Sequence, residues 1–272
     1  MLVAASVCPC PPLLVPEVAS GAAPELDAAR TACSDALAVL AAARPDRLVV
    51  VGPAEKAGRG SHPEGARGSF RAFGVDVGVR LGRVGEHTLV NTPVTPRTAR
   101  EQGASGTSGT PEGNETPHAR DASSPGDLPP SLAVGAWLLE RAGWAAAPVE
   151  GLGVGEPLAP ERCVEVGREI GASSARVALL VMGDASACRT LKAPGYLDER
   201  AAPFDAEVAR ALGTVDVAAL RALDPELAYE LKACGRAPWQ VLAGAAEGAG
   251  LSGALLYEDA PYGVGYVVAA WS

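Results

Sequence analysis

Two short segments of this sequence hold residues suited to binding a metal ion or a polar ligand. Cys8 and Cys10 form a Cys-x-Cys pair in CPCPP, and Asp184 and Ser186 lie in GDASAC. Thiolates bind soft and borderline metals such as copper and zinc, whereas a carboxylate or a hydroxyl can bind a metal or a polar ligand. Both segments follow short apolar runs, so we expect them at the ends of buried strands.

The cysteines and Asp184 also have simpler interpretations. Cys188 could join Cys8 and Cys10 in a cluster of three thiols. However, one Cys-x-Cys pair is a weak metal signal, and the cysteines could equally be small buried side chains. Asp184 either lines a cleft or caps its own loop. Both alternatives stay open from the sequence.

The elements that would position these residues alternate between apolar strand-like runs and alanine-rich helical runs. Such alternation is typical of an α/β fold. We predict one domain, 1–272, with three layers: a mainly parallel central sheet flanked by helices. Strands are expected at 2–7, 47–51, 177–182 and 263–271, with hairpin strands at 73–81 and 87–90. Helices are expected at 24–43, 132–144, 161–170, 204–212, 217–223, 226–234 and 238–247.

Glycine, proline and aspartate mark the expected ends and connections of these elements. Pro24 suits the first position of its helix, and Asp224 suits an N-cap. Gly235 is expected to end the helix before it. The glycine-rich stretches 58–68 and 151–155 match no phosphate-binding spacing and are predicted to be loops. Residues 101–129, rich in Gly, Ser, Thr and Pro, are predicted to be a disordered insertion.

Composition excludes several partners. The chain has 23 basic and 32 acidic residues, a net charge of −9, and no basic cluster, which argues against nucleic-acid binding. No apolar run reaches the roughly 18 residues that a membrane span needs. Six irregularly spaced cysteines predict reduced thiols rather than a disulfide scaffold. We therefore expect a cytoplasmic protein with no membrane partner.

Ligands of open α/β sheets bind beyond the carboxyl ends of the strands. Four segments are expected there: CPCPP, GPAE at 52–55, GDASAC, and YEDAPYG at 257–263. Tyr257 and Tyr262 are candidate substrate-binding residues, with Tyr266 nearby, because tyrosines at a cleft can stack on an aromatic ring. Ordinary packing would explain these tyrosines equally well. Asp184 and Ser186 are the candidate catalytic residues.

The same segments, in the same order, carry a resemblance to a known family. CPCPPLLVPEV, VVVGP, GDASACRTLKAPGYLDERAAPFD and DAPYGVGYVVAAW resemble the class III extradiol ring-cleavage dioxygenases, in the subunit-B-like superfamily that includes the Memo proteins. The resemblance implies a non-haem Fe(II) held by two histidines and a carboxylate, with a further histidine as acid and base. It also implies ring opening of catechol-type substrates, and a homodimer or a second subunit.

The resemblance carries over to individual positions. Cys10 stands at the first histidine position, Ala54 and Glu55 at the second, and Ala187 at the acid-base histidine. Asp259, beside Glu258, is placed as the carboxylate.

Among the three histidines, His62, His87 and His118, only His62 lies in a segment that could reach the cleft; the alternative is a solvated loop histidine. The candidate metal ligands are therefore Cys10, Glu55, His62 and Asp259.

Cys10, Ala54 and Ala187 replace histidines of the family. We therefore expect a member of this superfamily with a lost or rebuilt metal site. Three hypotheses follow: an oxygenase with an atypical site, a non-catalytic protein that binds a small aromatic ligand, and a Memo-like redox or copper-associated protein that uses Cys8, Cys10 and Cys188. Fe(II) is the cofactor of the first, copper or zinc the metal of the third, and the second needs none.

Overall fold

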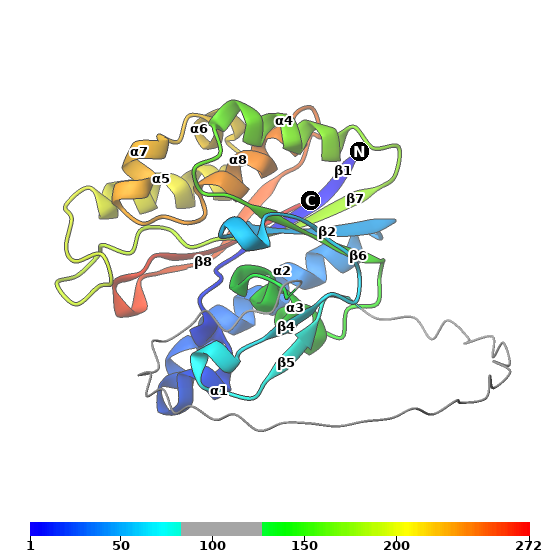
Figure 1. Ribbon diagram of the computed structural model, residues 1–272. Helices are drawn as coiled ribbons and strands as arrows, with labels where there is room; N and C mark the ends of the chain where they lie inside the picture. Colours follow the sequence, from blue (N-terminus) through cyan, green and yellow to red (C-terminus); the bar gives the residue numbers. More distant parts are fainter. Residues whose placement is uncertain (83–126) are drawn as a thin grey trace, which may run out of the picture.

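The computed structural model describes residues 1–82 and 127–272, and its centre is a seven-stranded sheet (Figure 1). The strand order is β3-β6-β2-β7-β1-β9-β8. The four inner strands from β6 to β1 are parallel, whereas β3, β9 and β8 pair antiparallel at the two sides. The bounds are β1 Leu2–Cys8, β2 Arg47–Pro53, β3 Gly60–His62, β6 Val149–Val154, β7 Val177–Met182, β8 Gly253–Asp259 and β9 Tyr266–Trp271.

Helices cover both faces of this sheet (Figure 1). One face packs against α2 (Asp27–Ala42) and α3 (Pro130–Arg141), and the other against the group from α4 to α8. That group comprises α4 (Pro160–Gly171), α5 (Ala201–Thr214), α6 (Val217–Arg221), α7 (Pro225–Glu230) and α8 (Arg236–Ala245). A short α1 (Pro16–Ala19) and a ribbon of β4 (Arg67–Ser69) and β5 (Gly78–Arg80) lie beside the α2 and α3 face.

The VALLVM sequence of β7 explains its central place. Alternate residues of a strand point to opposite faces, and all six side chains of β7 are buried. Leu179 and Val181 belong to the core under α5 to α8, whereas Leu180 and Met182 belong to the core under α2 and α3. A parallel strand covered on both faces therefore appears as a continuous apolar run.

The prediction of a mixed α/β fold with strands at β1, β2, β7 and β9 is confirmed, but two stretches were assigned wrongly as loops. Residues 151–154 belong to β6, and 60–62 form β3. A Cβ on Gly153 would overlap the carbonyl oxygen of Gly58. Gly153, which suggested a loop, thus allows the backbone of Gly58, just before β3, to lie against β6.

Other boundaries also differ from the prediction. Strand β8 was missed, because an edge strand with mostly exposed side chains lacks a clear apolar alternation. Pro24 lies inside a 3-10 helix, Ser20–Leu26, rather than opening α2. Of the predicted strand 73–81, only Gly78–Arg80 pairs. Helix α7 ends at Glu230, and Gly235 precedes α8 instead of ending a helix.

Of the predicted insertion, the structure describes residues 127–129. Residues 101–126, together with the predicted strand 87–90 and the two other histidines, lie outside the described residues. At the end of the predicted insertion, Leu128 is buried and packs in the core. No helix in the two described ranges is long and apolar enough to cross a membrane.

Candidate functional site

The ends of β1 and β7 bring the first two candidate residues together. These strands are parallel neighbours with Cys8 in register with Met182, so the loops that follow them leave the sheet side by side. The Gly183 N–H donates to the Cys8 carbonyl at 3.0 Å, and the Cys10 N–H donates to Asp184 Oδ1 at 2.7 Å. CPCPP and GDASAC therefore meet at the carboxyl edge, as predicted for these segments.

A third residue, Cys234, reaches the same point from the turn between α7 and α8. After α7 ends, the backbone reverses at Lys232, which adopts a left-handed φ of 57°. The Gly235 N–H then donates to the Asp184 carbonyl at 3.0 Å. The Asp184 N–H points to Cys234 Sγ at 3.4 Å. Cys234 was absent from every predicted site, since 50 residues separate it from Asp184.

Two glycines make this approach possible. A Cβ on Gly183 would lie 2.5 Å from the Gly235 Cα, closer than such atoms come in proteins. The two backbones thus touch at a place where neither residue carries a side chain. Asp184 and Cys234, which follow and precede these glycines, are held next to each other by that contact.

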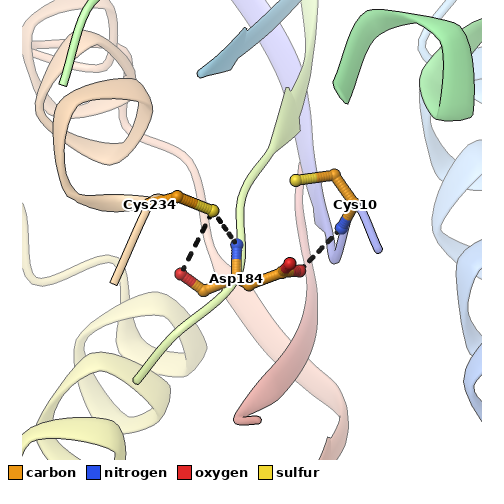
Figure 2. Close-up of side chains that lie close together, drawn as sticks. All are labelled: Cys10, Asp184 and Cys234. Carbon is orange, nitrogen blue, oxygen red and sulfur yellow. Dashed lines mark hydrogen bonds between the residues drawn. The ribbon is translucent and has the colours of Figure 1, made fainter. Parts of the chain in front are cut away.

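Together, Cys10, Asp184 and Cys234 form a cluster of potential metal ligands (Figure 2). Their two sulfur atoms and one carboxylate oxygen all lie within 4.8 Å of one another. Cys10 is buried, and the other two residues are partly buried. The ligand atoms of a tetrahedral zinc ion lie roughly 3.3 to 3.8 Å apart, so small side-chain rotations would bring these three onto one ion.

The close contact affects the titration of the group. The neighbouring Cys234 thiol, burial and the charge of Asp184 all raise the pKa of Cys10. Burial raises the pKa of Asp184 from its ordinary value of 3.8 to about 7, although the hydrogen bonds from Cys10 oppose the shift. The pKa of the buried Tyr266 is raised by burial, with contributions from Asp184 and Cys10. Tyr266, at the start of β9, therefore lies near the cluster.

We expect the metal-free protein to lose stability relative to an Asp184→Asn variant as the pH rises from about 4 to about 8. The folded-state pKa of Asp184 is above its unfolded value, so folding favours the protonated form, and that contribution is lost as the pH rises through about 7. A tenfold change in an acid dissociation constant corresponds to about 1.4 kcal/mol; because solvent reaches part of the side chain, we expect a total of about 1 to 3 kcal/mol. Urea unfolding in the presence of a chelator measures the difference between the two proteins. A difference that grows in favour of the wild type with pH would contradict this expectation.

Ser186, predicted as a catalytic candidate, is engaged elsewhere. Its backbone N–H and its hydroxyl donate to the two oxygens of Asp205 at 2.8 and 2.9 Å. Arg189 Nη1 also donates to Asp205 at 2.9 Å, and the Asp205 side chain is only 2% exposed. Ser186 therefore helps to hold the GDASAC loop on α5, through a buried aspartate that was not among the predicted site residues.

The other predicted metal ligands do not join the cluster of Cys10, Asp184 and Cys234. Glu55 is exposed after β2. His62 ends strand β3 rather than lying in a loop, and its Nε2 lies 2.9 Å from the Gly58 carbonyl oxygen. Asp259 ends β8, separated from β1 by β9, and accepts a hydrogen bond from Ala260 N–H at 2.7 Å. Only Cys10 of the four predicted ligands thus lies in the cluster.

The two predicted substrate-binding tyrosines lie on the β9 side of this edge. The Tyr257 hydroxyl donates to Asp259 at 3.4 Å, and the Tyr262 hydroxyl donates to Glu25 at 2.9 Å. Tyr262 adopts a left-handed φ of 61° and is exposed. Ordinary contacts therefore account for both hydroxyls in the structure, and their role in binding a substrate stays a prediction.

The predicted cluster of Cys8, Cys10 and Cys188 is replaced by a different arrangement. Cys8 lies against Cys33, and both pack in the core under α2 and α3. Cys188 belongs to the opposite core and its thiol points to the Leu231 carbonyl at 3.5 Å. Cys10 has Cys234 as its thiol neighbour instead. None of the six cysteines is paired in a disulfide in the structure.

A cavity of about 370 Å³ adjoins the cluster on the α7 side. Cys234 lies in its wall, together with Tyr229, Lys232 and Glu156. Tyr229 is largely exposed at this surface. A ligand in this cavity would have direct access to Cys234.

The fold defines a protein of the α/β class with four parallel inner strands and a polar cluster at their carboxyl ends. No family model matches the chain, and no curated protein matches it. Among solved structures, it is similar to an uncharacterized protein, JW3007, from Escherichia coli K12. The two are 16% identical, with a TM-score of 0.50 over 99% of each chain, which supports the fold over the full length and no more.

The residues do not fit the iron site that the family resemblance implies. That site needs two imidazoles and a carboxylate, whereas the cluster offers two thiols and a carboxylate. The one described histidine, His62, contacts Gly58. The donor chemistry of this edge is thus that of a softer metal.

Proposed function

We propose that this chain is a class III extradiol dioxygenase-like protein, a single three-layer domain whose metal site has been rebuilt and whose small-molecule site lies at the carboxyl edge of the sheet. One observation carries the proposal: the segments that bear the resemblance meet there. Cys10 of CPCPP hydrogen-bonds Asp184 of GDASAC. Gly265 of DAPYGVGY donates to the Ser186 carbonyl and accepts from Ala185 N–H, both at 2.8 Å.

The donor set argues for a changed activity. Iron-dependent ring opening in this superfamily relies on histidine donors; Cys10 stands at the first histidine position, and its neighbours near Asp184 include the Cys234 thiol rather than an imidazole. We therefore propose that the protein binds a small phenolic or aromatic ligand without opening its ring. The cavity beside Cys234 suits a single-ring molecule, because its volume is at the lower end of ligand pockets. Tyr229 would stack on the ring, and Lys232 would attract a phenolate.

A Memo-like redox or copper-associated function is the second candidate. The neighbouring thiols of Cys10 and Cys234 favour it, since copper(I) prefers sulfur donors. Both candidates place the protein in a reducing compartment, because all six thiols are free. We accordingly propose a cytoplasmic location.

Oxygen uptake and ligand binding test the first candidate. After anaerobic loading with Fe(II), we expect the protein to consume oxygen with catechol at no more than about twice the protein-free rate. We also expect 4-nitrocatechol to bind saturably in equilibrium dialysis. Loss of one stacking aromatic is worth about 0.5 to 1.5 kcal/mol, so Tyr229→Ala should weaken binding by about 2- to 13-fold.

The matched control is Phe73→Ala, which removes an exposed aromatic outside the cavity wall and should leave binding unchanged. Rapid oxygen uptake with a ring-opened product would contradict the changed activity. The absence of saturable binding, or equal binding by Tyr229→Ala, would contradict the assignment of the ligand site. Copper rather than zinc in the protein as purified would favour the second candidate.

A further inference from the structure

We propose that Cys10, Asp184 and Cys234 bind one Zn²⁺ ion, with the fourth coordination position directed toward the cavity beside Cys234. This inference deepens the proposed function because it names the metal of the same site. It rests on the three side chains themselves, and its test uses no aromatic ligand.

The fold brings the three ligand atoms together from separate parts of the chain. They come from three separate places, after β1, after β7 and before α8, and lie within 4.8 Å of one another (Figure 2). Backbone hydrogen bonds fix each place: Gly183 N–H to the Cys8 carbonyl and Gly235 N–H to the Asp184 carbonyl, both at 3.0 Å. A site on three anchored backbones would need only side-chain rotation to accept an ion.

The charges of the three ligands also favour a divalent ion. The thiols of Cys10 and Cys234 and the carboxylate of Asp184 would carry three negative charges when deprotonated. Zinc binding would release the two thiol protons to the solvent, and the divalent charge of the ion would offset the two thiolates and the carboxylate.

Two thiols and one carboxylate limit which metal ion the site can bind. Magnesium and calcium take oxygen ligands, and the thiols exclude them. Copper(I) would use the sulfurs but gain little from a carboxylate, whereas zinc accepts both sulfur and oxygen donors. Three protein ligands with an open fourth position are the arrangement of catalytic zinc sites, in which water or a ligand fills the last position. Cys234 lines the cavity, so the open position would be reached from there.

The experiment uses the full chain, reduced and stripped of metal under argon. We expect it to bind one Zn²⁺ per chain in competition with a chromophoric chelator. Co²⁺ in its place should give an intense sulfur-to-metal charge-transfer band and strong visible bands, typical of tetrahedral thiolate coordination. Zn²⁺ should also protect Cys234 from alkylation, as read by mass spectrometry.

Variants assign the ligands. Cys10→Ser and Cys234→Ser should each weaken zinc binding by about 100-fold or more, since even changes behind a metal ligand cost about 10- to 100-fold. Asp184→Asn keeps an oxygen to accept the Cys10 N–H and should weaken binding while the thiolate band of Co²⁺ remains. Cys188→Ser, a change at another buried thiol, is the matched control and should bind like the wild type. Circular dichroism and thermal unfolding establish that each variant is folded.

The inference is overturned if the folded wild type binds no stoichiometric zinc, or if Cys10→Ser and Cys234→Ser bind it as the wild type does. Zinc binding with no binding of 4-nitrocatechol would contradict the proposed ligand site alone. Binding of 4-nitrocatechol with no zinc would contradict the zinc site alone.

Discussion

Replacing Asp205 with alanine is expected to lower the free energy of unfolding by about 3 to 5 kcal/mol. The side chain is 2% exposed and accepts hydrogen bonds from the Ser186 N–H, the Ser186 hydroxyl and Arg189. Its removal leaves the buried N–H and hydroxyl of Ser186 without acceptors, at about 1 to 3 kcal/mol each, and Arg189, which is 30% exposed, without its ion pair. The Asp205→Ala variant should also loosen the GDASAC loop, and with it Asp184. Urea unfolding measures the stability.

Two further variants test whether the loss of stability comes from the buried hydrogen bonds of Asp205 or from the loss of one negative charge. Asp205→Asn keeps the shape of the side chain and one of its two acceptor oxygens, and should cost less than alanine. Asp76→Ala breaks the exposed ion pair with Arg71, at 2.7 Å, and should cost less than about 1 kcal/mol. An Asp205→Ala protein as stable as Asp76→Ala would show that the buried network does not hold the loop.

Replacing Gly183 with alanine is expected to separate Asp184 from Cys234. The new Cβ would lie 2.5 Å from the Gly235 Cα, and a backbone atom cannot rotate away as a side chain can. Overpacking typically costs about 1 to 3 kcal/mol, and we expect about 3 kcal/mol here because the contact is backbone to backbone. Zinc affinity should fall by about 100-fold or more, since one thiol would leave the cluster.

The control for this variant is Gly21→Ala. Nothing lies within 4 Å of a Cβ built on Gly21, so the substitution should leave both stability and zinc affinity unchanged. Chelator competition and urea unfolding report the two quantities on the same samples. A Gly183→Ala protein that binds zinc like the wild type would refute the role of the glycine contact in building the cluster.

The inner part of the fold could be predicted because its strands are buried on both faces. A run such as VALLVM has few alternatives, and Asp224 before Pro225 marks a helix start, where its side chain caps the N–H groups of Glu226 and Leu227. The edges could not be predicted in the same way. Strand β6 contains Gly151 and Gly153, which suggest a loop until a neighbouring backbone is seen to occupy the space of a side chain.

The sequence predicts only those residues of the site that lie directly after a strand. Cys10 and Asp184 each follow an apolar strand, and parallel neighbours bring such positions together. Cys234 depends on a reversal of the backbone at Lys232 and on the contact between two glycines, and neither leaves a periodic pattern in the sequence. His62 and Asp259 illustrate the opposite error, because a metal-binding residue type near the right edge does not define where its side chain can reach.

The most direct test of the account is X-ray absorption at the zinc edge of the metal-loaded protein. We expect two sulfur neighbours at about 2.3 Å and two oxygen or nitrogen neighbours at about 2.0 to 2.2 Å, the distances of tetrahedral zinc with two thiolates, one carboxylate and a water molecule. One sulfur neighbour should disappear in Cys234→Ser. A zinc ion surrounded only by oxygen and nitrogen, or one whose sulfur neighbours persist in Cys234→Ser, would contradict the central claim that Cys10, Asp184 and Cys234 form a single metal site.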